Sequence, residues 1–349
     1  MFADILSVDC LVAEPMPSFA ERLLGVCVRV HSDIPKTVVF VGTEVGGRFN
    51  PLGTAFLGSV EHKGNYFNFV ITAKHVIDLA GSQAVIRLNR KEREPIVLPL
   101  NHMKLVDPIH DLAVISIALP DAMDQFCLPL GRAVHLDELE RKWRPDLGDE
   151  VATVGLYSSH HGVTRNVPVV RIGNIARMPD DELVRSNSGG YISAYLVETK
   201  SILGLSGSPV FVNVPRVRFD QNGSMQTLRG ARITEFPIGV MIGYHLVRSA
   251  EDQIAVPHNE DADPGPDTDE RNTGFAVVVP IERVFDLLEK RELVAAMDET
   301  VNHLSKTGGF RPASVGGPQT DDEIARKRDA GLLRALNTPP KPKAKPDTV

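Results

Sequence analysis

Short runs of β-branched and aliphatic residues recur between about residues 24 and 280, separated by Gly, Pro, Asn and Asp. No helical pattern separates these runs, as it would in a parallel sheet. The pattern therefore predicts an all-β fold of antiparallel barrels or a sandwich. The clearest runs are GVCVRV, TVVFVG, FNFVIT, AVIRL, LAVISI, EVATVG, VPVVRIG, SPVFVNV, PIGVMIGY and GFAVVV.

The polar segment around residues 120–147 divides these runs into two groups of similar size. We therefore expect two barrels joined by a linker, barrel one over about 24–120 and barrel two over about 148–280. After that point the apolar residues recur at helical spacing, and Pro280 suits the first turn of a helix. The pattern predicts a closing helix over 280–298, with Ile281, Val284, Phe285 and Leu288 on its apolar face.

The two ends of the chain differ from its centre. Segment 1–23 has neither a basic stretch ahead of an apolar one nor an apolar run of membrane-spanning length, so we expect no signal peptide, no membrane span and a cytoplasmic protein. Residues 299–349 are polar and end in NTPPKPKAKPDTV, which predicts a mostly disordered tail. Within it, a capping-box pattern predicts a short helix over 320–336. That helix is either a docking element for a regulatory partner or a solvated, partly ordered helix.

Composition narrows the function. The chain has 349 residues, 42% of them hydrophobic, enough for a large core. Its net charge of -7 argues against nucleic-acid binding through a basic face. Cys10, Cys27 and Cys127 are widely spaced, which suits buried thiols in a reducing compartment. No Cys/His cluster suggests a metal site, and nothing in the sequence requires a cofactor. The acidic segment 249–272 is expected to be a surface loop that could overhang a cleft.

Three polar residues stand where strands begin or end. His75 follows the strand in FVITAKHVIDLA, Asp111 opens the buried strand in HDLAVISI, and Ser206 interrupts ILGLSGSPVF. Each has an ordinary structural interpretation, as a core histidine, a turn-capping aspartate and a tight turn. Together they offer a weak nucleophile, a base to activate it and a buried carboxylate to orient that base. Asp107 competes for the last role, although its place before Pro108 suggests a turn.

Gly204 adds a second element of the same chemistry. Its freedom to turn lets its own N–H and that of Ser206 converge on one point, as an oxyanion hole requires. The blocks ITAKHV, HDLAVISI and GLSGSPV, in that order, resemble the Thr-Ala-x-His-Val, Asp-Leu-Ala-Val and Gly-x-Ser-Gly-Gly/Ser-Pro blocks of chymotrypsin-fold serine proteases, most closely the bacterial trypsin-like, Deg-type branch. Weaker matches in register are LGDEVATVGL, PIGVMIGY and TGFAVVVPIERV. The resemblance covers residues 24–298.

The resemblance implies two perpendicular six-stranded barrels with the active site between them. It implies that His75 is the general base, Asp111 its orienter and Ser206 the nucleophile, with the oxyanion bound by the amides of Gly204 and Ser206. It also places Lys200 near the base of the primary specificity pocket. Ile242, Gly243 and Tyr244 would line the wall of that pocket. The resemblance further implies that the substrate is a protein or peptide.

The sequence departs from the family at two positions of this loop. Leu205 replaces the aspartate that zymogen-activated members use, so activation by N-terminal cleavage is not expected, and Ser208 replaces the commoner glycine. Nothing resembling a PDZ domain follows the closing helix.

Three other functions compete with that of a constitutive endopeptidase. An α/β-hydrolase esterase fails because its nucleophile motif needs a glycine at position 208 and its triad has another order. A catalytically silent member of the same fold could act as a peptide-binding or regulatory module. The third is a protease whose resting active site is blocked or disordered until a partner binds the tail or the acidic loop. The sequence is equally compatible with this function and with constitutive proteolytic activity.

Overall fold

The structure is a computed structural model, and it describes residues 30–91, 93–120, 123–130, 144–162, 164–180, 183–186, 190–199, 204–214, 217–219, 224–227, 235–247 and 271–307. Several predictions from sequence lie outside these residues: the N-terminal segment 1–23, the acidic segment as far as residue 270, Lys200, and the helix predicted over 320–336.

The helices are α2 (Ile34–Thr37), α3 (Lys74–Ala80), α4 (Glu282–Leu288) and α5 (Arg291–Thr307), with 3-10 turns η1 (Gly81–Gln83) and η5 (Ser158–His160). The strands are β1 (Val38–Val45), β2 (Arg48–His62), β3 (Asn65–Ala73), β4 (Val85–Arg90), β5 (Arg93–Pro99), β6 (Lys104–Asp107), β7 (Leu112–Ile117), β8 (Leu128–Pro129), β9 (Glu150–Gly155), β10 (Val169–Arg177), β11 (Val184–Arg185), β12 (Tyr191–Ile192), β13 (Tyr195–Glu198), β14 (Pro209–Asn213), β15 (Val217–Phe219), β16 (Met225–Thr227), β17 (Glu235–Val247) and β18 (Arg271–Pro280).

The first eight strands form one sheet. Its order is β5-β4-β1-β2-β3-β7-β6, all antiparallel, and β8 adds to β2 in parallel. Strands β1, β2 and β3 each bury an aromatic ring completely, from Phe40, Phe56 and Phe69. The resemblance to chymotrypsin-fold proteases implies six strands here, and the sheet has eight. Pairing among the described residues does not join β5 to β6, so a closed first barrel stays a prediction.

The second group of strands closes on itself. Strands β10, β13, β18, β17, β14 and β9 form a closed barrel, with every neighbouring pair antiparallel. This part of the prediction, a six-stranded antiparallel barrel in the second half of the chain, is confirmed. Closure removes the free strand edges that would otherwise expose unpaired backbone groups.

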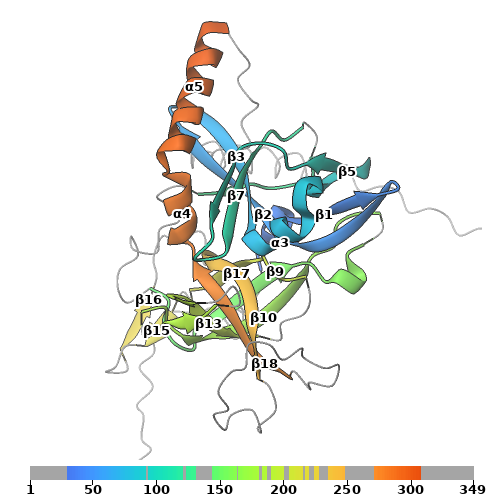
Figure 1. Ribbon diagram of the computed structural model, residues 1–349. Helices are drawn as coiled ribbons and strands as arrows, with labels where there is room; N and C mark the ends of the chain where they lie inside the picture. The colour runs from blue at the N-terminus through green and yellow to red at the C-terminus, as the bar shows by residue number, and fades with distance from the viewer. Residues whose placement is uncertain are drawn as a thin grey trace, which may run out of the picture. The chain divides into compact units, whose positions relative to one another are not determined.

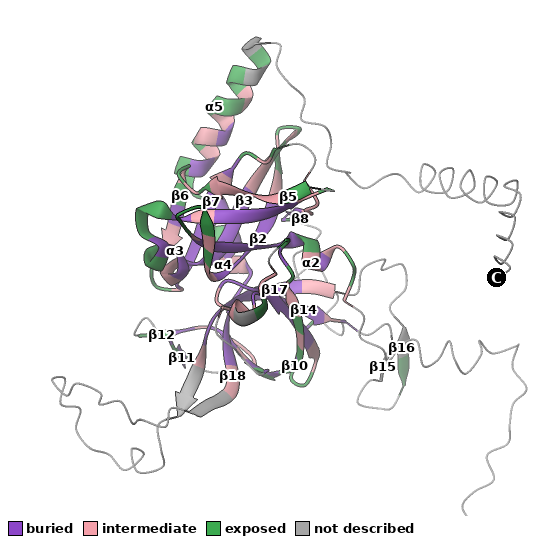
Figure 2. Cartoon of the chain, turned by 90° about the vertical axis from the view of Figure 1, so that its right-hand side faces the viewer, coloured by how far each residue is buried: buried purple, intermediate pink, exposed green. Residues whose placement is uncertain are grey.

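One apolar cluster joins the sheet to the barrel. Phe56 and Ile71 of the sheet belong to the same cluster of buried residues as Phe211 and Val240 of the barrel. Figure 2 shows buried residues running through the strands of both. A second cluster, with Val197 and Met241, fills the barrel interior. The two halves therefore share a dry interface, in which any polar contact must be internally satisfied.

Two helices follow the barrel where the sequence predicts one. Pro280 is the last residue of β18, opposite Gly239, and is not in the first turn of a helix. The ladder extends this far because proline is tolerated at a strand end. Helix α4 buries the predicted Val284, Phe285 and Leu288 and also Leu287, while the predicted Ile281 is buried at its N-cap. Helix α5 begins after a break at Glu289–Lys290. Helix α5 extends to Thr307, so residues 299–307 are helical where a disordered tail is expected.

Ion pairs connect the middle of α5 to the β2–β3 hairpin. The carboxylate of Asp298 lies 2.6 Å from His62 Nε2 and 2.6 Å from Lys63 Nζ. The hydrogen bonds from His62 and Lys63 hold the pKa of Asp298 below its ordinary value. His62 ends β2 and Lys63 lies in the turn to β3, so the two contacts link the helix to this hairpin of the sheet (Figure 1).

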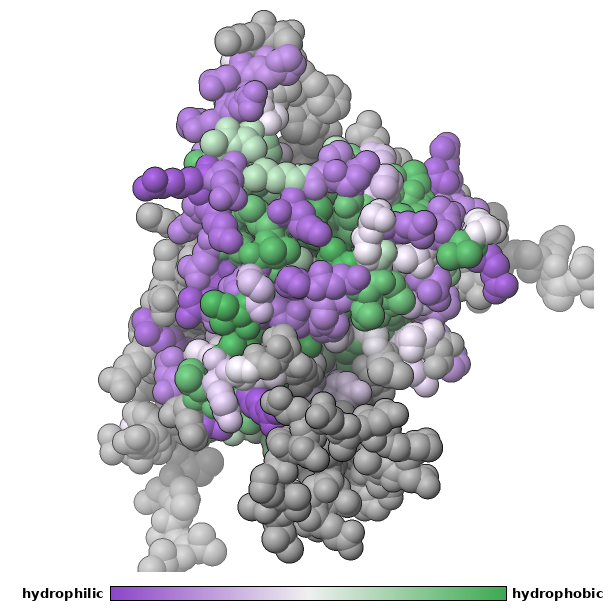
Figure 3. Space-filling view, in the orientation of Figure 1, coloured by the Kyte–Doolittle hydropathy of each residue, from purple (hydrophilic) through white to green (hydrophobic). Residues whose placement is uncertain are grey.

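The described surface is mixed in character. Apolar and polar side chains are interspersed over the N-terminal sheet on the face drawn in Figure 3, and exposed apolar residues include Leu79 and Ile109. Of the helices in the described part of the chain, none combines the length and apolar character that crossing a membrane requires. Cys127 is a buried free thiol, and burial raises its pKa to about 12, so it is unreactive as a nucleophile.

A buried arginine of the sheet forms hydrogen bonds with a loop of the barrel half. Arg87 of β4 donates to Asn166 Oδ1 at 2.6 Å and to the carbonyls of His161 and Gly162 at 3.1 and 2.9 Å, all in the β9–β10 loop. Its guanidinium lies 4.9 Å from the ring centre of Phe49. Burial lowers the pKa of Arg87, and every hydrogen-bond partner named here is neutral. Its charge is therefore stabilised by dipoles and an aromatic face.

We expect Arg87→Lys to lower the free energy of unfolding by about 2 kcal/mol, because an ammonium cannot reproduce the planar fork that meets three acceptors. Urea unfolding followed by circular dichroism measures the effect. Arg165→Lys is the control, since the Arg165 side chain is 61% exposed and lies 3.4 Å from Asp124. Equal effects of the two substitutions would contradict a special role for Arg87.

Candidate active site

His75 and Asp111 meet because β3 and β7 are paired. The register sets Ala73 opposite Leu112, so the residues just beyond this pair, Lys74 and Asp111, are also adjacent. His75 Nδ1 lies 2.6 Å from Asp111 Oδ2. The side chain of Asp111 is only 7% exposed, whereas that of His75 is 40% exposed. A buried carboxylate thus holds one edge of a ring whose other edge is accessible.

The same aspartate caps helix α3. The N–H of Lys74 donates to the Asp111 carbonyl at 2.8 Å, and the N–H of His75 donates to Asp111 Oδ1 at 2.9 Å. These amides belong to the first turn, which has no acceptor within a helix, and Ala73 offers no side-chain cap. Asp111 has a φ of 55°, in the left-handed region that few non-glycine residues adopt. The bonds to α3 hold it in that conformation.

The contact with Asp111 fixes which ring nitrogen of His75 can act as a base. An ionised carboxylate only accepts hydrogen bonds, so the proton of a neutral His75 ring must sit on Nδ1. The lone pair is then on Nε2, the nitrogen that Asp111 does not touch. This arrangement prepares His75 to take a proton from a neighbouring group and stabilises the imidazolium that forms.

The Gly204–Ser208 loop enters β14 through a tight turn. Ser208 N–H donates to the Leu205 carbonyl at 2.9 Å, and Gly207 N–H donates to the Met241 carbonyl at 2.7 Å. Gly204 has a φ of 99°, which a side chain would oppose. Among the described residues, the N–H groups of Gly204 and Ser206 have no hydrogen-bond acceptor. Both donors remain available to a ligand oxygen.

Two close approaches place this loop beside His75. A Cβ on Gly53 would lie 2.7 Å from the methyl groups of Val76 and 3.3 Å from the carbonyl oxygen of Ser206, so a glycine separates the two segments. A Cβ on Gly207 would lie 3.1 Å from the backbone nitrogen of Ala73. The structure therefore brings the Ser206 loop against the segment that carries His75. No hydrogen bond joins the side chains of Ser206 and His75 themselves, although both residues are described.

The predicted pocket wall reaches the same loop. Met241 of β17 accepts from Gly207 N–H and donates to the Ser208 carbonyl at 2.9 Å, and Ile242, Gly243 and Tyr244 follow it along the strand. Ile242 is buried and Tyr244 is half-buried. These residues follow the strand that contacts the Gly204–Ser208 loop, and Lys200 lies outside the described residues, so both the wall and the base of the pocket stay predictions.

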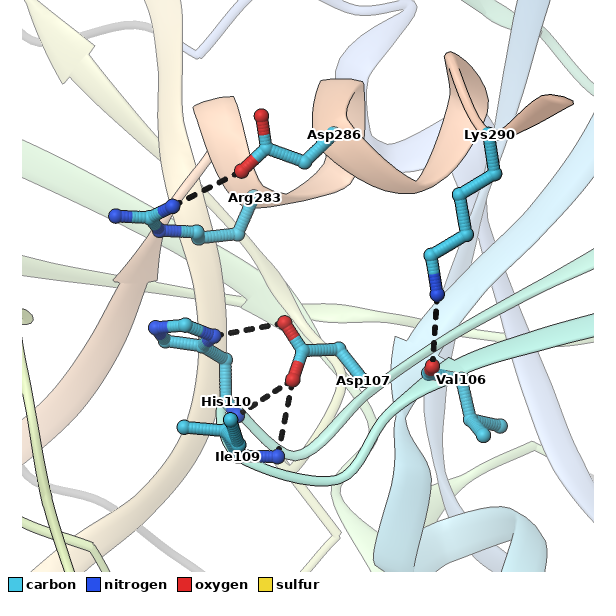
Figure 4. A network of polar contacts seen from close by, with 7 residues as sticks. All are labelled: Val106, Asp107, Ile109, His110, Arg283, Asp286 and Lys290. Carbon is cyan, nitrogen blue, oxygen red and sulfur yellow. Dashed lines mark hydrogen bonds and ion pairs between the residues drawn. The ribbon is translucent and has the colours of Figure 1, made fainter.

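Asp107, the competing orienter, serves a turn. Its Oδ1 accepts from the N–H groups of Ile109 and His110 at 2.9 and 3.1 Å, and its Oδ2 lies 2.7 Å from His110 Nδ1 (Figure 4). Burial opposes its ionisation, but the bonds from His110 and Ile109 outweigh burial and lower the pKa of Asp107. Neither oxygen is directed to His75. The turn that Asp107 closes leads directly into Asp111. Sequence reasoning did not identify His110 as a partner of Asp107 in this turn.

The turn lies beneath the C-terminal helices. Figure 4 shows the Asp107–His110 pair facing α4, where Arg283 binds Asp286 at 3.0 Å, and Lys290 reaching the carbonyl of Val106 at 3.4 Å. No group of three or more His, Cys, Asp or Glu side chains in the described ranges is placed to hold a metal ion.

Comparisons with known proteins give a likeness of fold at low identity. No protein-family model matches the chain, and no curated protein matches it. Solved structures that resemble it include the protease domain of MamO from Magnetospirillum magneticum, 14% identical, with a TM-score of 0.42 over 75% of this chain and 100% of that one. The active form of the Rv3671c protease from M. tuberculosis is 16% identical, with a TM-score of 0.39 over 90% and 97%.

A third similar structure is the HtrA-type protease AlgW with a decapeptide, 15% identical, with a TM-score of 0.40 over 78% of this chain and 67% of that one. These structural neighbours are trypsin-like serine proteases. At such identities and TM-scores the likeness carries no argument about chemistry, which rests on the geometry above.

We expect Asp107→Asn to destabilise the protein at pH 7 and to have less effect in acid. A carboxylate whose pKa is lowered by folding contributes stability above its ordinary pKa of about 3.9, and the contribution is lost as the pH falls through the folded value. The difference between the urea midpoints of the parent and the variant should therefore narrow as the pH falls from 7 to about 3.5. Asp286→Asn, on an exposed pair, is the control, and a difference that does not narrow as the pH falls would contradict the assignment.

Proposed function

We propose that the protein is a serine endopeptidase in which Ser206 is the nucleophile, His75 the general base and Asp111 the residue that orients His75. The observation that carries the proposal is the 2.6 Å contact between His75 Nδ1 and the buried Asp111 carboxylate, on a ring that remains accessible. A structural histidine needs no such combination. The proposal includes the two-lobed arrangement of chymotrypsin-like proteases, with the site between the sheet and the barrel.

The chemistry proceeds in two halves. Ser206 Oγ attacks the carbonyl carbon of the scissile peptide while its proton moves to His75 Nε2. The carbonyl oxygen becomes an oxyanion, which the free N–H groups of Gly204 and Ser206 stabilise. His75 then gives the proton to the leaving amine, and an acyl-enzyme remains. Water attacks that ester with His75 again as base, which releases the acid and restores Ser206.

One observation favours a second candidate function, a catalytically silent peptide-binding module of the same fold. Ser206 and His75 share no hydrogen bond, and an inert scaffold would have no use for one. Catalytic hydrogen bonds are often long in proteins without substrate and tighten on binding, so this geometry does not exclude catalysis. Chemical reactivity of Ser206 separates the two functions.

We expect a fluorophosphonate probe to label the parent protein at Ser206, with the Oγ–phosphorus bond formed, fluoride released and the proton taken by His75. Ser206→Ala should abolish labelling, and His75→Ala should nearly do so. Mass spectrometry of the intact protein and of its peptides measures the modification. Ser208→Ala is the matched control, because Ser208 is fully buried two residues away and should leave labelling unchanged. A folded parent that resists the probe would favour the binding module.

We expect Asp111→Asn to keep the fold and to lower turnover by about 10³- to 10⁴-fold. The side-chain oxygen of asparagine can still accept from the backbone N–H of His75 and so retain the cap on α3. Its NH₂ group would face His75 Nδ1, force the proton onto Nε2 and remove the base. Turnover of a peptide substrate and thermal unfolding should be measured together. Unchanged turnover would remove Asp111 from the mechanism.

A further inference from the structure

Thr54 of β2 is fully buried where the sheet meets the nucleophile loop, and sequence reasoning did not single it out. Its hydroxyl donates to the Gly204 carbonyl at 2.7 Å and accepts from the Leu156 N–H at 2.7 Å. Its backbone N–H donates to the Ser206 carbonyl at 2.9 Å. Its own carbonyl accepts from the Thr72 hydroxyl at 2.6 Å. Thr54 thus connects the sheet with two separate segments of the barrel half.

These bonds determine which way the loop's carbonyl groups point. Thr54 holds the carbonyls of Gly204 and Ser206, and the Ser208 N–H holds that of Leu205. All three carbonyls of this stretch are therefore engaged within the protein. The N–H groups of Gly204 and Ser206 have no acceptor among the described residues. The carbonyl of one residue shares a planar peptide with the N–H of the next residue, and the two groups point in opposite directions. The Leu205 carbonyl therefore sets the direction of the Ser206 N–H. The peptides on either side of it carry the Gly204 and Ser206 carbonyls, and Thr54 holds both.

The hydroxyl of Thr54 is the part of this network that a substitution can remove. Without it, the buried Leu156 N–H would be left unpaired, which is costly, and the half-buried Gly204 carbonyl would lose its partner within the protein. The peptide between Gly204 and Leu205 would then be free to rotate, because Gly204 has no side chain to resist the rotation. Such a rotation changes the backbone angles at Gly204 and Leu205, and it displaces the adjoining peptide that carries the Ser206 N–H.

We propose that Thr54 is a positioning residue for the oxyanion hole, acting through the Gly204 carbonyl; this inference rests on the proposed function. It touches neither substrate nor reacting atoms. The hydroxyl itself carries the role, because the backbone N–H of any residue at this position could still bind Ser206. The role of Thr54 is therefore distinct from the packing that its methyl group provides.

The test compares Thr54→Val, which keeps the shape and loses the hydroxyl, with Thr54→Ser, which keeps the hydroxyl and loses the methyl. Thr153→Val is the matched control, since Thr153 is a fully buried threonine of β9 whose hydroxyl has no partner among the described residues. The readouts are the rate of fluorophosphonate labelling at Ser206, kcat and KM for a peptide substrate, and amide hydrogen exchange of Leu156 and of residues 204–208.

We expect Thr54→Val to slow labelling and lower kcat by at least about tenfold with KM little changed, because the hole acts on the transition state. Thr54→Ser and Thr153→Val should stay within about threefold of the parent. Exchange at Leu156 and in the loop should rise in Thr54→Val alone. Unchanged rates in Thr54→Val, or an equal loss in Thr54→Ser, would overturn the proposal.

Two further outcomes are kept separate. If the parent protein is not labelled at all, the proposed function fails. Hydrogen exchange then decides on Thr54, since faster exchange in Thr54→Val but not in Thr54→Ser supports its hold on the loop and equal exchange overturns it. If Thr54→Val does not fold, Thr54→Cys takes its place. Its thiol is a weaker donor of similar size, so it should give a smaller loss in the same direction, and no loss would overturn the proposal.

Discussion

The buried carboxylate of Asp111 is the constraint on which the site depends. An ionised group in the interior must be fully hydrogen-bonded, and the chain meets that demand with the first turn of α3 and with the His75 ring. The helix in turn obtains its missing cap from this distant residue. The left-handed backbone at Asp111 therefore places one residue where it both caps α3 and orients the His75 ring. The cap and the ring in turn provide the hydrogen bonds that its buried carboxylate needs.

The contact between the sheet and the barrel combines an apolar cluster with specific polar contacts. Thr54 and Arg87 both reach from the sheet into segments of the barrel half, and both meet neutral acceptors. Thr54 acts on the nucleophile loop, whereas Arg87 holds the loop between β9 and β10. A hydroxyl and a guanidinium thus fix two loops that the apolar cluster alone would leave without a defined conformation, since apolar packing is not directional.

Local patterns predicted much of the fold. The alternation in LAVISI, EVATVG and GFAVVV marks strands that the structure contains as β7, β9 and β18. None of the runs singled out covers β2, because Pro51, Gly53 and Gly58 make it resemble turns, and its length comes from pairing with distant strands. Sequence also left Asp107 and Asp111 as competitors. Only the β3–β7 register, which is not local, decides which carboxylate meets His75. The role of Thr54 had no signal, since the partners of its hydroxyl, Gly204 and Leu156, are over a hundred residues away.

The two oxygens of Asp111 divide their work, and this division has an evolutionary consequence. Oδ1 and the backbone carbonyl serve the helix, while Oδ2 serves the ring. The side-chain amide of an asparagine could still accept from the helix N–H, but it could not accept from the ring N–H of His75. Aspartate and asparagine codons differ by one nucleotide, so under the proposed mechanism a lineage could exchange turnover for pure binding in a single mutational step, without passing through an unfolded intermediate.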